Sequence, residues 1–220
     1  MAKLPALVTA LAATDGRDRA TLGVIARSIR EAGHITTTKR GGGAAEMTAT
    51  DAAALVIGAN AVQSPRQAAT AVQEYRTFKQ TPHGRSETAP IYSRLAQSDT
   101  LLDALAVLVE EAVALDAAFR NWVARAYSPA HAEADTVGIF RPILAVTFHG
   151  ASVDIAVQAR TGPNWEDVDR HEWRFVVDVN LMMQRFYTLP GTGPDRRVST
   201  TIGLPTFLSL HRALFPAGHT

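Results

Sequence analysis

The chain has 220 residues, of which 46% are hydrophobic and 20% are charged, as expected for a globular protein with a substantial core. It has no cysteine, which excludes disulfides, thiolate nucleophiles and cysteine-bound metal centres. The net charge is only +1, but residues 1–85 hold 11 Lys and Arg against 6 Asp and Glu, whereas residues 86–220 hold 11 against 15. The basic excess near the N-terminus is suited to binding a polyanion.

Several functional classes find no support in the sequence. No apolar run reaches the roughly 20 residues of a membrane-spanning helix, and the N-terminal stretch becomes charged too soon for a secretion signal. No histidine pair has the spacing of a helical zinc site, and no P-loop, nucleophile elbow or kinase signature occurs. We therefore expect a cytoplasmic protein that is not an enzyme, has no membrane contact and needs no metal or cofactor.

Two helices are predicted before residue 34. The first covers about residues 4–13, where leucines and a valine recur at helical spacing. The second follows Asp18, a residue type that caps helix N-termini, and ends at Gly33, which can adopt a left-handed conformation before the apolar Ile35. Its apolar side is expected to hold Leu22, Ile25, Ala26 and Ile29.

Two more helices are predicted before residue 80. Thr48 and Asp51 have the spacing of a short capping box, and the helix that they open carries an apolar stripe. Ser64 and Pro65 form a good start for a further helix that ends near Lys79. These four helices would form a basic helical head over residues 1–80.

The connector between the second and third helices, residues 34–46, is basic and rich in glycine and threonine. It is longer than the roughly three or four residues of a simple helix-turn-helix turn, so we expect an extended loop or wing. Hydroxyls, cations and bare backbone amides all bind phosphate oxygens, and the alternative is a solvated loop beside an ordinary wet helix face. The predicted DNA-binding residues are Arg17, Arg19, Arg27, Arg30, Thr36, Thr37, Thr38, Lys39, Arg40, Gly41, Gly42, Thr48 and Thr50.

A linker is predicted at residues 81–97, which are rich in Pro, Ser and Thr, and it precedes a domain over residues 98–220. From Ser98, a candidate cap, a long helix runs to Tyr127 without Gly or Pro. It carries a heptad seam that is interpreted either as a core covered by the C-terminal sheet or as a self-association surface. The predicted oligomerisation residues on this seam are Leu101, Leu105, Leu108, Leu115, Phe119 and Trp122.

The C-terminal part predicts a small, mostly antiparallel sheet. Strands are expected at residues 143–149 and 152–160, joined by a turn at Gly150 and Ala151. Two more are expected at residues 172–179 and 198–203, before a final helix at residues 205–215. The predicted fold class is α+β, with an N-terminal helical, helix-turn-helix-like head, a long central helix and a C-terminal sheet with flanking helices.

One carboxylate pattern resembles a nuclease site. Asp154 on a strand, followed by Glu172 and Arg174, approximates the carboxylates and lysine of a metal-dependent nuclease, but the lysine is missing. The acidic residues near position 167 are more simply interpreted as a solvated loop. Metal-dependent nuclease activity is therefore kept only as a third functional hypothesis.

The stretch IREAGHITTTKRGGGAAEMTATDAAALVIGAN, residues 29–60, resembles uncharacterised helix-turn-helix DNA-binding proteins of alphaproteobacterial prophages and gene transfer agents. The resemblance covers under a quarter of the chain and implies a phage-related setting, without a catalytic residue. We expect a transcriptional regulator that binds double-stranded DNA as a homo-oligomer, with a protein partner for its acidic C-terminal domain. The alternative is a DNA-packaging adaptor similar to small terminase subunits.

Overall fold

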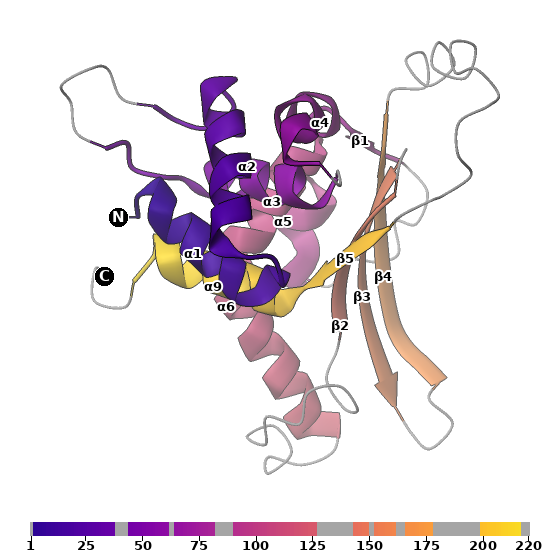
Figure 1. The fold of residues 1–220 in the computed structure, drawn as a ribbon. Helices are drawn as coiled ribbons and strands as arrows, with labels where there is room; N and C mark the ends of the chain where they lie inside the picture. The colour runs from indigo at the N-terminus through magenta and orange to yellow at the C-terminus, as the bar shows by residue number, and fades with distance from the viewer. Residues whose placement is uncertain are drawn as a thin grey trace.

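A layer of helices packs against one face of a five-stranded sheet in the computed structural model (Figure 1). The structure describes residues 2–37, 44–61, 64–81, 90–126, 143–149, 152–161, 166–177 and 199–216. This arrangement confirms the predicted α+β class, with a helical N-terminal part, a long central helix and a C-terminal sheet. The α-helices are α1 (Leu4–Asp15), α2 (Arg19–Glu31), α3 (Ala49–Asn60), α4 (Ala68–Tyr75), α5 (Ser93–Ala96), α6 (Leu101–Ala126) and α9 (Leu204–Leu214), and two short 3₁₀ helices are η1 (Pro65–Gln67) and η2 (Pro90–Tyr92).

The sheet has the strand order β1-β4-β3-β2-β5, and every neighbouring pair is antiparallel. The register sets Phe148 of β2 opposite Val153 of β3, and Val153 opposite Phe175 of β4. All three side chains are buried, so they share the sheet face that the helices cover. Buried and less buried residues alternate along β3 from Ser152 to Gln158, as in a strand with one covered face. The strands are β1 (Lys79–Gln80), β2 (Ile143–Phe148), β3 (Ser152–Thr161), β4 (Glu166–Val176) and β5 (Thr200–Gly203).

Two predicted helix ends in the head are confirmed by their hydrogen bonds. The Asp18 carboxylate accepts from the Thr21 backbone N–H at 2.9 Å, as an N-cap should. Gly33 has a φ of 79°, and the backbone N–H groups of Gly33 and His34 donate to the carbonyls of Arg30 and Ile29 at 3.0 Å each. This is a Schellman ending for α2.

Other element boundaries differ from the prediction. The central helix is capped by Thr100, whose hydroxyl accepts from the Asp103 N–H at 3.2 Å, and not by Ser98. β4 begins at Glu166, six residues before the predicted start, because its pairing with β3 continues beyond the apolar part of the strand. β1 was not predicted, since a two-residue edge strand leaves no alternation in the sequence. The predicted turn at Gly150 and Ala151 lies outside the described residues.

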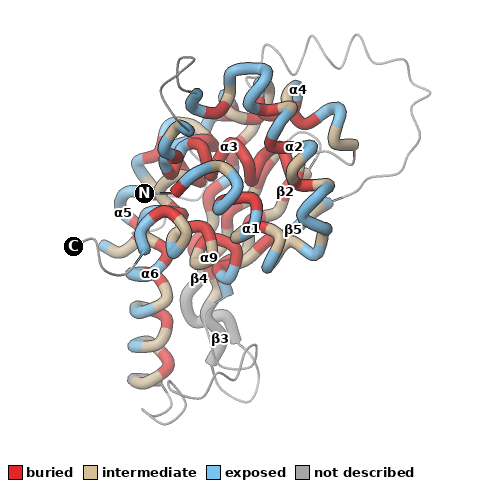
Figure 2. Tube along the Cα trace, turned by 60° about the vertical axis from the view of Figure 1, so that its left-hand side comes forward, coloured by how far each residue is buried: buried red, intermediate tan, exposed pale blue. Residues whose placement is uncertain are grey.

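α3 lies at the centre of the helical layer, and every residue from Asp51 to Asn60 is buried. It packs against α2, α4, α6 and α9. Gly58 permits the closest approach, because a Cβ there would lie 2.3 Å from the Ile29 Cδ1 of α2. Figure 2 shows α3 as a continuous buried segment between neighbours that alternate between buried and exposed residues.

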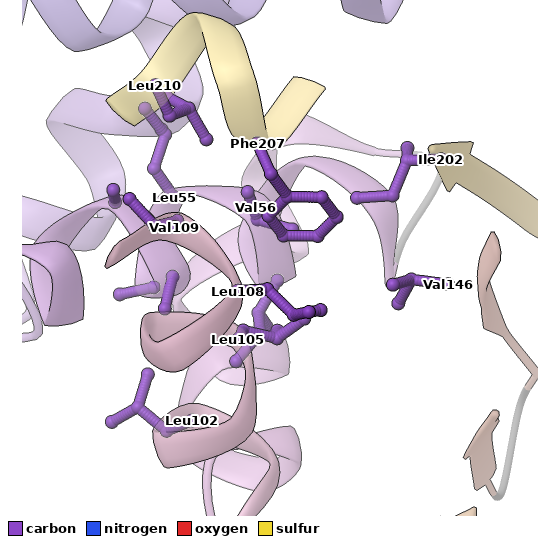
Figure 3. Close-up of a cluster of buried hydrophobic side chains, with 14 of the residues drawn as sticks. Leu55, Val56, Leu102, Leu105, Leu108, Val109, Val146, Ile202, Phe207 and Leu210 are labelled. Atoms are coloured by element: carbon purple, nitrogen blue, oxygen red, sulfur yellow. The ribbon is translucent and has the colours of Figure 1, made fainter. Parts of the chain in front are cut away.

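The hydrophobic core is continuous from the first helices to the last. Figure 3 shows apolar side chains from α3, α6, α9, β2 and β5 in one cluster, which includes Leu55, Leu108, Phe207, Val146 and Ile202. α1 also packs along α9. The predicted boundary at residues 81–97 therefore does not separate two cores among the described residues, and residues 82–89 lie outside them.

Candidate nucleic-acid interface

The exposed side of α2 is the most basic helical surface in the head. Arg19, Val24, Arg27 and Arg30 are all exposed and lie on the side opposite the buried Leu22, Ile25, Ala26 and Ile29. We call these four exposed residues the α2 face. The side chain of Arg27 is 73% exposed, and Val24 is 56% exposed although it is apolar. The predicted DNA-binding residues Arg19, Arg27 and Arg30 are thus brought together on one accessible surface.

Little negative charge opposes the cations of the α2 face. Within the described residues, Arg19 and Arg30 make no ion pair, and Arg27 approaches the Glu31 carboxylate at 3.8 Å. Both members of that pair are mostly exposed, so the pair contributes little to stability and leaves Arg27 able to exchange partners. The α2 face can therefore bind an external anion without first breaking a buried interaction.

Two further basic residues, Arg66 and His34, lie close to α2 in the fold. Arg66 is exposed on η1, which packs against α2, and it was not among the predicted DNA-binding residues. No local sequence pattern shows that residues 65–67 return to α2. The pKa of His34 lies below its ordinary value, first because partial burial disfavours the charged form and second because Arg76 is close. His34 therefore adds little positive charge near neutral pH.

The connector that follows α2 is held at its base by the buried carboxylate of Asp51. Asp51 Oδ1 accepts from the Thr36 N–H at 2.8 Å and from the Thr36 hydroxyl at 3.0 Å. Asp51 Oδ2 accepts from the Thr48 N–H at 2.8 Å and from the Thr48 hydroxyl at 2.9 Å. One side chain therefore joins the start and the end of the connector and also caps α3, as the predicted capping box requires.

The N-terminus fixes the returning end of the connector. The Met47 N–H donates to the Ala2 carbonyl at 2.9 Å, and the Lys3 ammonium donates to the Ala44 carbonyl at 2.7 Å. Lys3 also lies 3.8 Å from the Glu46 carboxylate. The predicted contacts Thr38, Lys39, Arg40, Gly41 and Gly42 lie outside the described residues.

The threonines that were predicted to bind DNA have different surroundings. The hydroxyls of Thr36 and Thr48 donate to Asp51, so neither has its proton free for a phosphate oxygen. Thr37 and Thr50 are exposed, and Thr50 lies in the first turn of α3. Within the described residues, no hydrogen bond is formed by the side chain of either.

α3 lacks the geometry of a recognition helix. A recognition helix lies in the major groove with one exposed face, but α3 is buried on all sides after Thr50. Only its N-terminal end, at Thr48 and Thr50, reaches the surface. The second helix of the predicted helix-turn-helix therefore has a structural role in the core, and the exposed helix of the pair is α2.

Arg17 is directed into the protein rather than toward an external partner. Its Nη2 donates to the Asp15 carboxylate at 2.7 Å, its Nε donates to the same carboxylate, and its Nη1 donates to the Ala59 carbonyl. The Asp15 side chain is only 1% exposed. This differs from the predicted DNA contact, because Asp15 holds the Arg17 guanidinium at the end of α1 and the hydrogen bond to the Ala59 carbonyl links it to the end of α3.

The predicted oligomerisation seam of α6 is filled within the chain. Leu101, Leu105, Leu108, Leu115 and Phe119 are all at most 3% exposed, and α6 packs against α3 and α9. Trp122 is partly buried. An internal core accounts for all five buried residues, but the helices α3 and α9 cover the seam rather than the C-terminal sheet alone. Self-association through the seam would require these residues to separate from their present neighbours.

The carboxylates considered for a nuclease lie on the sheet face away from the helices. Asp154 accepts from the Arg174 guanidinium at 2.7 and 3.1 Å, and Glu172 lies 3.6 Å from the same guanidinium. Arg174 thus occupies the position between the two carboxylates where a cation would have to bind. The described residues contain no group of three or more His, Asp or Glu arranged to hold a metal ion.

Among the described residues, no helix combines the length and apolar character needed to cross a membrane. No family model, curated protein or solved structure matches the chain.

Proposed function

We propose that the chain binds double-stranded DNA through the α2 face and acts as a transcriptional regulator in a phage-related setting. The observation that carries this proposal is the cluster of exposed arginines on a helix whose opposite side is anchored in the core. Lys and Arg side chains that neutralise phosphates supply most of the affinity of a DNA-binding surface. The basic excess of residues 1–85 supports the same location.

α2 suits direct insertion into the major groove. Its 13 residues make a rod of about 20 Å, and the major groove is about 12 Å wide, enough for one α-helix. Guanidinium groups such as those of Arg27 and Arg30 bind guanine edges or phosphates, and an exposed apolar side chain such as Val24 can contact a thymine methyl. The α2 face therefore combines groups for phosphate contact with groups for base contact.

The connector is the second element of the proposed interface. Asp51 holds Thr36 and Thr48 together, so the cations and glycines between them start from a fixed base beside the end of α2. A wing or arm next to a groove-binding helix adds phosphate contacts and fixes the register of the protein on the duplex.

The burial of the seam of α6 favours a transcriptional regulator over a DNA-packaging adaptor. A packaging adaptor needs a helical hub shared by many copies, and the seam that would supply it is already buried within one chain. We propose a small homo-oligomer, because linking two basic surfaces raises affinity without new contacts in either. Native mass spectrometry would show a dimer or tetramer for a regulator, whereas a ring of eight or more subunits would support the packaging adaptor instead.

The interface is tested by removing two charges from the α2 face. The double variant Arg27→Ala/Arg30→Ala should weaken binding to all DNA sequences, and the slope of log K against log salt should fall in magnitude by about 1.8, or about 0.9 per lost phosphate contact. Fluorescence anisotropy with a labelled duplex at several salt concentrations measures both quantities. The matched control is Arg212→Ala, which removes an exposed arginine from α9.

A second double variant tests the contribution of the connector independently of the α2 face. Lys39→Ala/Arg40→Ala should also reduce the affinity and the salt slope, and unchanged binding would remove the connector from the interface while leaving the α2 face. An unchanged slope in the α2 variant would exclude the α2 face. A wild-type protein that retards no DNA at low salt would exclude DNA binding altogether.

A further inference from the structure

α6 carries a second row of residues with heptad spacing, on a side of the helix other than its buried seam. The members of this row are partly or fully exposed and recur at spacings of 4, 3, 4, 3 and 4 residues: Ala106, Glu110, Val113, Ala117, Arg120 and Ala124. Residues with this spacing lie along one side of a helix. We call these six residues the outer seam. Figure 2 shows the second half of α6 extending beyond the other helices.

The middle of the outer seam adjoins a second exposed apolar side chain. Val113 is 47% exposed and Phe215 of α9 is 51% exposed, although both are large and apolar. The His211 ring lies between them. Its Nδ1 is 2.9 Å from the Val109 carbonyl, which in an α-helix accepts the Val113 N–H, and its ring centroid is 4.9 Å from that of Phe215. Adjoining apolar side chains that stay exposed are typical of a protein contact surface.

The outer seam is complementary to itself when a second copy of α6 runs antiparallel. A twofold axis that passes beside residue 115 places Glu110 five positions before the axis and Arg120 five positions after it. Glu110 of each copy then lies opposite Arg120 of the other, so two pairs of opposite charge form. The remaining positions pair apolar residues only: Val113 with Ala117, and Ala106 with Ala124.

The side chains of the outer seam also suit a close approach of two helices. Small alanines at its ends and near its middle permit helix axes to lie about 8 Å apart, and the contact from Ala106 to Ala124 is about 27 Å long. Within one copy, Glu110 pairs with Arg94 at 2.6 Å and Arg120 pairs with Asp116 at 2.9 Å. A carboxylate can accept from more than one donor, so Glu110 can keep Arg94 while it also binds Arg120 of a second copy.

We propose that a second copy of this chain packs antiparallel on the outer seam, so that the protein dimerises through the outer side of α6. A helix with charge of only one sign would set a like charge against either Glu110 or Arg120, whereas a second copy matches both. The buried seam of α6 stays in the core of each copy. The role of this dimer, to link two α2 faces, rests on the proposed function, but the contact itself follows from α6 and α9.

Sedimentation velocity of the full chain without DNA, over a range of concentrations, should show a reversible dimer. Glu110→Arg alone and Arg120→Glu alone set like charges across the seam, and each should weaken dimerisation by about tenfold or more. The double variant Glu110→Arg/Arg120→Glu restores opposite charges and should dimerise at least about threefold more tightly than either single variant. The two positions are about 15 Å apart along one helix, so this rescue requires two copies. The control Arg66→Glu reverses an exposed charge on η1, which packs against α2, α3 and α4, and should leave dimerisation unchanged.

The absence of cysteine from the chain allows a test of the register. Val113→Cys and Ala117→Cys, made in separate chains and then mixed, should form a disulfide-linked dimer on mild oxidation, because the two positions face each other across the axis. Ala106→Cys mixed with Ala117→Cys is the matched control. These two positions are about 10 Å out of register and should crosslink far less.

Three results would each overturn the proposal: a wild-type chain that stays monomeric, a double charge variant that dimerises no more tightly than the single ones, or equal crosslinking of both cysteine pairs. None of these measurements involves DNA. A monomer that still binds DNA would overturn this contact and leave the α2 face, whereas a dimer that retards no DNA would support the contact and exclude the proposed DNA binding.

Discussion

α2 and α3 are consecutive helices of nearly equal length, 13 and 12 residues, but they have opposite roles in the structure. α2 buries one side and exposes three arginines on the other, whereas α3 is buried on every side after its first turn. Alanine-rich α3 has no charged residue after Asp51, and a helix that is apolar all round belongs in a core. The position of a helix in the pair therefore does not show which of the two could bind DNA, and the exposed charge is the reason that we propose α2.

The largest expected difference between the two helices comes from removing one apolar side chain from each. Leu55→Ala in α3 should lower the free energy of unfolding by about 3–4 kcal/mol, because Leu55 is fully buried and its loss leaves a cavity. Val24→Ala in α2 should change it by less than about 0.5 kcal/mol, since Val24 is 56% exposed. Urea denaturation followed by circular dichroism measures both. Equal costs would contradict the assigned burial of the two helices.

The second difference lies in the carboxylate that joins the two helices. Asp51→Ala should destabilise the chain by about 2–3 kcal/mol, because four donors of Thr36 and Thr48 lose a buried, charged acceptor. Asp51→Asn keeps one acceptor oxygen and should cost less. The neighbouring Thr50→Ala, at an exposed position, is the control and should have almost no effect on the unfolding midpoint.

The glycines of the two helices should respond to alanine with opposite signs. Gly58→Ala in α3 places a methyl against Ile29 and Val72, and we expect a loss of about 1–2 kcal/mol. Gly23→Ala in α2 meets no atom within 4 Å, and we expect a gain of about 0.5–1 kcal/mol from better helix propensity. Thermal unfolding of the two variants gives the signs directly. A stabilising Gly58→Ala would mean that α2 and α3 are less closely packed.

The smallest effect concerns the acid dependence of the start of α2. The pKa of Asp18 is lowered, chiefly by hydrogen bonds from the Thr21 side chain and backbone N–H, so the folded chain favours the carboxylate. Its contribution to stability is therefore present above the unfolded pKa of about 3.9 and is lost as pH falls through the lower folded value. Asp18→Asn can still cap the helix but does not titrate, so the stability difference between it and the wild type should shrink below about pH 4. A constant difference down to pH 2 would contradict this role.

Local chemistry made much of the fold predictable. Asp18, Thr48 and Gly33 act through atoms within a few residues of themselves, so their sequence patterns predicted the ends of α2 and the start of α3 correctly. The alternation in β3 likewise depends on side chains two residues apart. The confirmed α+β class follows from these local patterns and from the long stretch without Gly or Pro that became α6.

Features that depend on distant contacts were not predictable in the same way. Arg17 has the composition of a DNA contact, and only the folded chain brings the Ala59 carbonyl to its guanidinium. The heptad seam of α6 has the same pattern whether its partner is a second copy or α3 and α9.

The contacts of the Asp51 carboxylate also imply that the segment between Thr36 and Thr48 can be lengthened at little cost in stability. Because both ends of this segment are fixed at one side chain, a longer segment pays only the entropy of closing a larger loop, and doubling its length costs about 0.6 kcal/mol. Neither α2 nor α3 has to move when residues are added there. This segment is therefore the natural insertion point of the head, where a peptide tag or a longer arm can be accommodated while the core beneath keeps its packing.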